Sequence, residues 1–174
     1  ATGTTNADQS ITTVASGTDP FPTIQFGGRL MTADFNNDGN LDILYQDHAS
    51  GSAVHLALGN GNGTFQAPIN AVGGTFTSGP LNGVHISDVI DTNVYAVDLN
   101  GDGKVDLVLN QDGNTAPLVY QNTGSCFTAV TNPFPSQQFA GRFIFGDFNN
   151  DGYIDVLNQQ GNVIAAYDPL GREL

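Results

Sequence analysis

Carboxylate side chains recur at fixed intervals in three short segments of the sequence. The segments read DFNNDGNLD from position 34, DLNGDGKVD from position 98 and DFNNDGYID from position 147. All three fit the pattern D-x-N-x-D-G-x-x-D, and we call them loops one, two and three. When such a loop wraps around an ion, the side chains at positions 1, 3 and 5 converge, position 7 offers a backbone carbonyl and position 9 returns a carboxylate. Because Ca²⁺ prefers such an all-oxygen set, the sequence predicts three calcium ions, one per loop.

The predicted metal ligands are the residues at positions 1, 3, 5, 7 and 9 of each loop. They are Asp34, Asn36, Asp38, Asn40 and Asp42 in loop one, Asp98, Asn100, Asp102, Lys104 and Asp106 in loop two, and Asp147, Asn149, Asp151, Tyr153 and Asp155 in loop three. Three carboxylates held together repel one another without a counter-ion. We therefore expect calcium to stabilise the fold by binding the native state preferentially.

Other interpretations of the loops are weaker. An EF-hand needs a Glu at position 12, where this chain has Tyr45, Leu109 and Asn158. Magnesium favours fewer protein ligands and more water, and zinc is disfavoured because the loops contain no Cys or His. Asp, Asn and Gly also form ordinary turns. A turn alone, however, gives no reason for nine Asp residues to share one register.

Short apolar stretches flank every loop and must position it. Their length of about four to six residues is typical of strands. Those before the loops are Leu30–Ala33, Val94–Val97 and Phe143–Phe145, and those after them are Leu41–Tyr45, Val105–Leu109 and Ile154–Leu157. Further strands are predicted at Ala53–Leu58, Thr64–Ala67, Pro117–Gln121, Cys126–Val130 and Val163–Tyr167. The fold class is therefore all-β, with each loop joining strands 1 and 2 of a four-stranded antiparallel unit.

The units are internal repeats within one domain of residues 1–174. Residues 20–42 and 133–155 match without a gap, and residues 94–109 form a third copy of the central part. The approximate units are 20–78, 79–132 and 133–174, with 10–14 as an outer strand that completes a unit.

The loops, together with the run LGNGNGTF from Leu58 to Phe65, resemble FG-GAP/VCBS repeats, the calcium-loop blades of integrin-α-type β-propellers. The resemblance implies a β-propeller in which strand 1 lines the central channel. It also implies an extracellular or cell-surface location and a role in adhesion or carbohydrate recognition. Three blades are fewer than the roughly four to eight that close a ring. We therefore expect either a homodimer that closes a six-bladed ring or a piece of a larger propeller.

The charge balance limits the partners. The net charge is −13, with four basic residues, and 16 of the 17 acidic residues are Asp. Such a surface disfavours nucleic acid, and no run of 18 apolar residues is present to insert into a membrane. Cys126 is the only cysteine, and we expect it to be a small buried hydrophobe.

No constellation of catalytic groups is visible, so we expect no enzyme. The connection Ile69–Asn93 contains the 15 extra residues of the first repeat, and Phe76 and His85 within it are candidates for stacking on a sugar. A plain surface excursion or an extra edge strand is the alternative. The expected function is a non-catalytic recognition module for glycan or protein. The alternatives are a structural spacer in a larger adhesin or toxin, and a propeller enzyme acting on polysaccharides.

Overall fold

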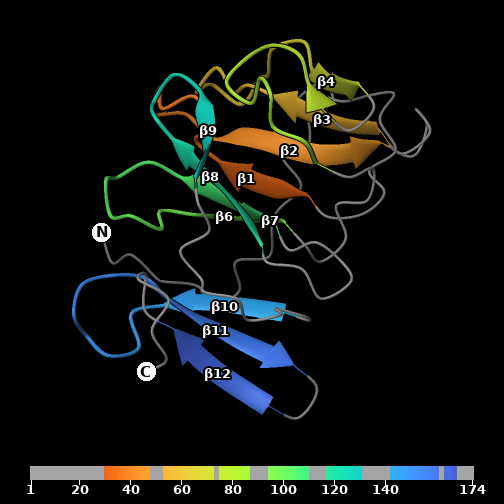
Figure 1. Cartoon of the computed structure of the whole chain (residues 1–174). Coiled ribbons are helices and arrows are strands. Elements are labelled where there is room, and N and C mark those ends of the chain that lie inside the picture. Colours follow the sequence, from red (N-terminus) through yellow and green to blue (C-terminus); the bar gives the residue numbers. More distant parts are fainter. Residues whose placement is uncertain are drawn as a thin grey trace, which may run out of the picture.

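The chain forms three antiparallel β-sheets that follow one another in sequence (Figure 1). The computed structural model describes residues 30–47, 53–72, 75–86, 94–109, 117–130, 142–160 and 163–167, and these contain twelve strands and no helix. Among these residues, no helix is long and apolar enough to cross a membrane. The all-β prediction is confirmed, whereas closure into a ring stays a prediction.

Every strand in each sheet pairs with its neighbour in chain order. Sheet one contains β1 (Met31–Ala33), β2 (Asp42–Asp47), β3 (Ala53–Ala57), β4 (Ile69–Val72) and β5 (Thr75–Phe76). Sheet two contains β6 (Val94–Val97), β7 (Asp106–Leu109), β8 (Leu118–Asn122) and β9 (Phe127–Val130). Sheet three contains β10 (Arg142–Gly146), β11 (Asp155–Gln160) and β12 (Val163–Tyr167).

The register of the first strand pair is the same in all three sheets. The residue before position 1 of each loop pairs with the Asp at position 9, as Ala33↔Asp42, Val97↔Asp106 and Gly146↔Asp155. Each loop is therefore the connection of a β-hairpin, as the sequence predicts.

The sheets stack through the alternate faces of their strands. In sheet two, Leu107 belongs to a core shared with Leu44 of sheet one, whereas the adjacent Val108 belongs to a core shared with Phe143 of sheet three. Side chains of a strand alternate between its two faces, so sheet two lies between the other two. This explains why β7 is buried along its whole length.

Sheet one corrects one predicted strand and decides between the alternatives for the extra residues of the first repeat. The fourth strand lies at Ile69–Val72 rather than at Thr64–Ala67, because the preceding segment forms a turn in which Gln66 N–H donates to the Leu58 carbonyl over 2.8 Å. The extra residues of the first repeat supply a fifth strand, β5, and three fully buried side chains, Leu81, Val84 and Ile86. The expectation of an extra edge strand is therefore confirmed, whereas that of a plain surface excursion is wrong, because these side chains are part of the core between sheets one and two. The predicted strand 10–14 lies outside the described residues.

Candidate metal sites

The three loops share two left-handed backbone positions. The Gly at position 6 has a φ of 87°, 84° and 88° in loops one, two and three. Position 4 is also left-handed, with Asn37 at 60°, Gly101 at 74° and Asn150 at 62°. Gly and Asn are the residues that adopt this region most readily, which is why the sequence allows only these two types at the two turning points.

Positions 1, 3 and 5 converge in every loop. In loop one, the backbone N–H of Asp38 donates to Asp34 Oδ1 and to Asn36 Oδ1, both over 3.1 Å, and Gly39 N–H donates to Asp34 Oδ2 over 2.8 Å. The same three bonds recur at the matching residues of loops two and three, with lengths of 2.8–3.1 Å. The six residues from position 1 to position 6 are thereby folded around the side chain at position 1.

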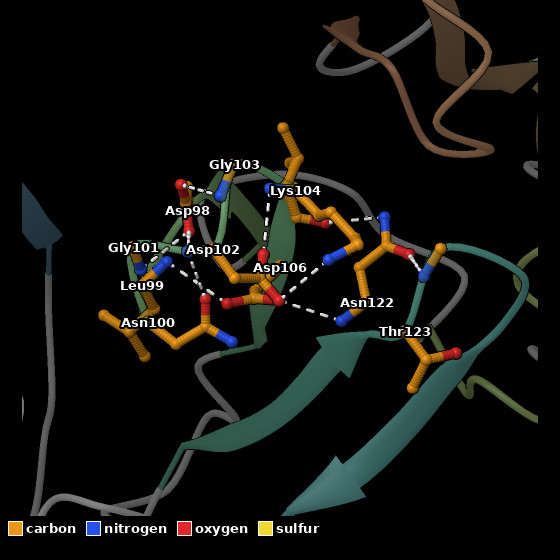
Figure 2. A network of polar contacts seen from close by, with 12 residues as sticks. Asp98, Leu99, Asn100, Gly101, Asp102, Gly103, Lys104, Asp106, Asn122 and Thr123 are labelled. Carbon is orange, nitrogen blue, oxygen red and sulfur yellow. Dashed lines mark hydrogen bonds and ion pairs between the residues drawn. The ribbon is translucent and has the colours of Figure 1, made fainter.

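The donor that binds Oδ2 of the Asp at position 5 distinguishes loop two from the other loops. In loops one and three, this oxygen accepts a hydrogen bond from the Asn at position 3, over 2.9 Å from Asn36 and 3.0 Å from Asn149. In loop two, Asp102 Oδ2 instead accepts from the Lys104 ammonium over 3.1 Å (Figure 2). Loop two therefore contains a positive charge of its own beside its carboxylates.

The Asp at position 9 faces a different set of donors. Asp42 is fully buried, and its two oxygens accept the N–H groups of Phe35, over 2.9 Å, and Gly59, over 2.8 Å. In loop two, Asp106 accepts those of Leu99, over 3.2 Å, and Asn122, over 2.8 Å (Figure 2). Position 9 thus ties loops one and two to the end of the third strand of their sheets.

Asn122 adds a contact between sheets. Its side-chain amide donates to the carbonyl of Val105 over 3.1 Å and to that of Phe35, in loop one, over 3.4 Å. Gly59 holds the equivalent place in sheet one, where a Cβ would lie only 2.2 Å from the Leu41 carbonyl oxygen, so only glycine fits. Sequence reasoning missed both residues, although the run LGNGNGTF marks the turn where Gly59 lies.

Loop three lacks one of these bonds. Asp155 Oδ2 accepts the N–H of Phe148 over 2.8 Å, but Asp155 Oδ1 is buried without a hydrogen-bond partner. In sheets one and two, the residue after position 9 pairs with Ala57 and with Tyr120, respectively. The donors Gly59 and Asn122 each lie two residues beyond that partner. In sheet three the paired residue is Tyr167, and the position two residues further lies outside the described residues.

Burial and hydrogen bonding shift the pKa values of the loop carboxyls in opposite directions. Burial raises the pKa of Asp42 and of Asp106 above the ordinary range, although the backbone N–H groups on each oppose this. The side-chain amide of Asn36 lowers the pKa of Asp38, and the N–H and ammonium of Lys104 lower that of Asp102. The exposed carboxyls of Asp38 and Asp102 are thus favoured in their charged form, which is the form that binds a cation.

The oxygens of positions 1, 3 and 5 fit a hard cation in their chemistry, since they comprise two carboxylates and one amide carbonyl. In the described residues, the three carboxylates of a loop are not gathered into a single cluster of metal-binding groups. In loop one, both oxygens of the position-9 carboxylate accept backbone N–H groups. Each carboxylate oxygen has two lone pairs, so a hydrogen bond leaves capacity for an ion.

Phe76 and His85, the predicted sugar-stacking residues, lie in different environments. Phe76 is 1% exposed and packs in the core between sheets one and two, so its ring has no free face and the prediction is wrong for this residue. His85 is exposed, and its Nδ1 lies 2.9 Å from Thr75 Oγ1. Cys126 is also exposed, contrary to expectation.

A second polar cluster lies on the other face of sheet one. The ring of His55 stacks on Tyr45 with centroids 5.1 Å apart, and His55 Nδ1 contacts Asn70 Oδ1. Burial, with a smaller contribution from the Asp47 charge, raises the pKa of Tyr45 to about 12. No motif marks these residues in the sequence, because they meet only through the register of three strands.

Comparison with known proteins gives matches to a protein family and to solved structures. A family model described as an FG-GAP-like repeat matches residues 34–93 and 98–157. The solved structure of an Agrocybe aegerita lectin, described as recognising non-reducing terminal N-acetylglucosamine, matches with a TM-score of 0.55 and 20% identity. The match covers 83% of this chain and 36% of the lectin chain, and it shows a likeness of fold. No curated protein matches.

Proposed function

Since this chain belongs to the FG-GAP-like repeat family, we propose that it is a non-catalytic, extracellular or cell-surface module that recognises carbohydrate or protein on a calcium-stabilised scaffold. The observation that carries the proposal is the repetition of one loop geometry three times, with the same left-handed positions and the same hydrogen bonds. An ordinary turn needs no such identity of polar side chains.

Calcium is supported by the chemistry of the donors. The side chains at positions 1, 3 and 5 provide only oxygen, and most of them are solvent-accessible enough to exchange an ion. They are the residues that would hold the ion, with the carbonyl of position 7 and the carboxylate of position 9 as further ligands. When bound, calcium would neutralise carboxylates that otherwise depend on hydrogen bonds from backbone N–H groups and from the side chains at positions 3 or 7.

Carbohydrate recognition is supported by the fold of the fungal lectin, which is described as recognising terminal N-acetylglucosamine. This chain spans about a third of that lectin, so the ligand of the larger protein is a starting point for the test rather than a conclusion. His85, exposed beside β5, remains the candidate contact.

Sheet three supports the expectation that further blades complete the structure. Ile144 on β10 is 58% exposed, whereas the residues at the same place in the other repeats, Met31 and Tyr95, pack against the next sheet. A second copy of the chain or another part of a larger propeller would cover this face. Light scattering at micromolar concentration distinguishes a dimer from a monomer.

Calcium binding is tested by thermal unfolding after treatment with EDTA and after addition of calcium or magnesium. We expect calcium to raise the melting temperature and magnesium to raise it less. The triple variant Asp34→Asn, Asp98→Asn, Asp147→Asn retains the shape of each side chain and is expected to lose the response. An unchanged melting temperature in EDTA would contradict the calcium proposal.

Recognition is tested on a glycan array that includes glycans ending in N-acetylglucosamine, with and without calcium. Binding that requires calcium supports the module, and no binding under either condition favours a structural spacer. Turnover of acidic polysaccharides in a parallel assay would instead indicate an enzyme.

A further inference from the structure

The three loops differ at two of the predicted ligand positions, position 7 and position 9. We propose that they therefore bind calcium with graded affinity, tightest in loop three and weakest in loop two. This inference rests on the proposed binding of calcium. It concerns how the residues around each loop tune that binding. Loop one serves as the reference because it has neither of the two differences.

Loop two is weakened by its own lysine. The Lys104 ammonium lies 3.1 Å from Asp102 Oδ2, on the oxygen that accepts an Asn amide in the other loops. A fixed ammonium beside the ligands repels any cation that the loop takes up, and it already neutralises one carboxylate.

The position of this lysine is defined by packing as well as by charge. Its stem lies against the turn between β8 and β9, since a Cβ added to Gly124 would be 3.4 Å from Lys104 Cε and 3.7 Å from Cδ. The N–H of Gly124 in turn donates to Asn122 Oδ1 over 2.8 Å. The side chain is therefore directed along the loop, and Figure 2 shows it beside Asp102 and Asn122.

Loop three is strengthened by an oxygen that has no partner. Asp155 is fully buried, and its Oδ1 receives no hydrogen bond, whereas Asp42 Oδ1 and Asp106 Oδ1 each receive one from a backbone N–H. A buried anionic oxygen without a partner is costly, and a cation nearby offsets that cost. In loops one and two, a hydrogen bond from a backbone N–H already offsets this cost. The gain in free energy on binding an ion is therefore larger in loop three. Loop three therefore combines three carboxylates, no lysine and one unpaired oxygen.

The test is a calcium titration by calorimetry on the whole chain after removal of metal. Three single variants assign the binding steps, because each removes the first carboxylate of one loop: Asp34→Asn, Asp98→Asn and Asp147→Asn. We expect Asp147→Asn to abolish the tightest step and Asp98→Asn the weakest. Terbium emission excited through tyrosine gives a second readout for loop three, where Tyr153 stands at position 7, and Tyr153→Phe should abolish it.

A matched pair of swaps at position 7 tests the role of the lysine. Lys104→Asn gives loop two the residue of loop one and should tighten its step about tenfold, whereas Asn40→Lys should weaken the step of loop one by a similar factor, or about 1.4 kcal/mol. Three equal steps, another order of the loops, or swaps without effect would overturn the inference. If the unmodified chain binds no calcium at all, the proposed function fails, and that outcome is distinct from these.

Discussion

Replacement of Gly59 by Ala should destabilise the fold far more than the addition of one methyl group usually does. A Cβ at this position would lie 2.2 Å from the carbonyl oxygen of Leu41 and 3.1 Å from its carbon. A carbon–oxygen contact requires about 3.3 Å, so the two backbone segments must separate by about 1 Å. The 2.8 Å hydrogen bond from Gly59 N–H to Asp42 Oδ1 would then exceed the range of a hydrogen bond.

The expected cost has two parts. Overpacking typically costs about 1–3 kcal/mol, and a lost hydrogen bond to a buried charged group costs about 1.5–3 kcal/mol. Together they give about 3–6 kcal/mol, a large fraction of the roughly 5–15 kcal/mol by which a domain is stable. The buried carboxylate of Asp42 would be left in the same condition as Asp155, with one oxygen unpaired.

Urea unfolding followed by circular dichroism measures this cost. The matched control is Gly146→Ala, because the same place before position 1 is Ala33 in the first repeat and Val97 in the second. An added Cβ there meets only the Phe148 ring, at 3.4 Å, so we expect a change within about 0.5 kcal/mol. A loss below about 1 kcal/mol for Gly59→Ala would refute the reasoning, because it would show that the turn moves freely.

Two further predictions concern the core and the buried tyrosine. Leu44→Ala, at a side chain with no exposed surface, should cost about 2–5 kcal/mol in urea unfolding, whereas Leu41→Ala, at 66% exposure, should change stability by less than about 0.5 kcal/mol; equal effects would contradict the assigned core. Because burial raises the pKa of Tyr45 to about 12 from 10.0, the folded chain keeps this phenol protonated where the unfolded chain releases its proton. The stability that depends on it is complete below pH 10 and falls by about 2–3 kcal/mol as the pH approaches 12, and Tyr45→Phe should reduce this slope, measured by urea unfolding at each pH.

Local features of the fold could be predicted from the sequence because they depend on neighbouring residues. The sequence predicts the strands that flank each loop to within three residues of their observed bounds, and the strand Val94–Val97 agrees fully. The left-handed Gly at position 6 follows from its place in the motif. The family is also confirmed by the match to residues 34–93 and 98–157.

The features that were missed depend on contacts between distant residues. The N–H groups of Gly59 and Asn122, which bind Asp42 and Asp106, lie 17 and 16 residues further along the chain. No local sequence pattern predicts these contacts. Phe76 was interpreted as an exposed ring because its connection is long and variable. It is buried because the segment containing Leu81, Val84 and Ile86 folds back onto the core, a result of packing rather than of local sequence.

The placement of sheet two between its neighbours gives the molecule the behaviour of a linear array. In such arrays, stability is approximately a sum of the intrinsic stability of each unit and of the interfaces between adjacent units. Leu107 and Val108 are consecutive in sequence, yet each belongs to a different interface. A destabilising substitution in sheet two therefore weakens the interfaces with both neighbours, whereas one in sheet three weakens a single interface. Opening of the native state should accordingly start at sheet three, and amide hydrogens of β10 and β11 should exchange before those of β7.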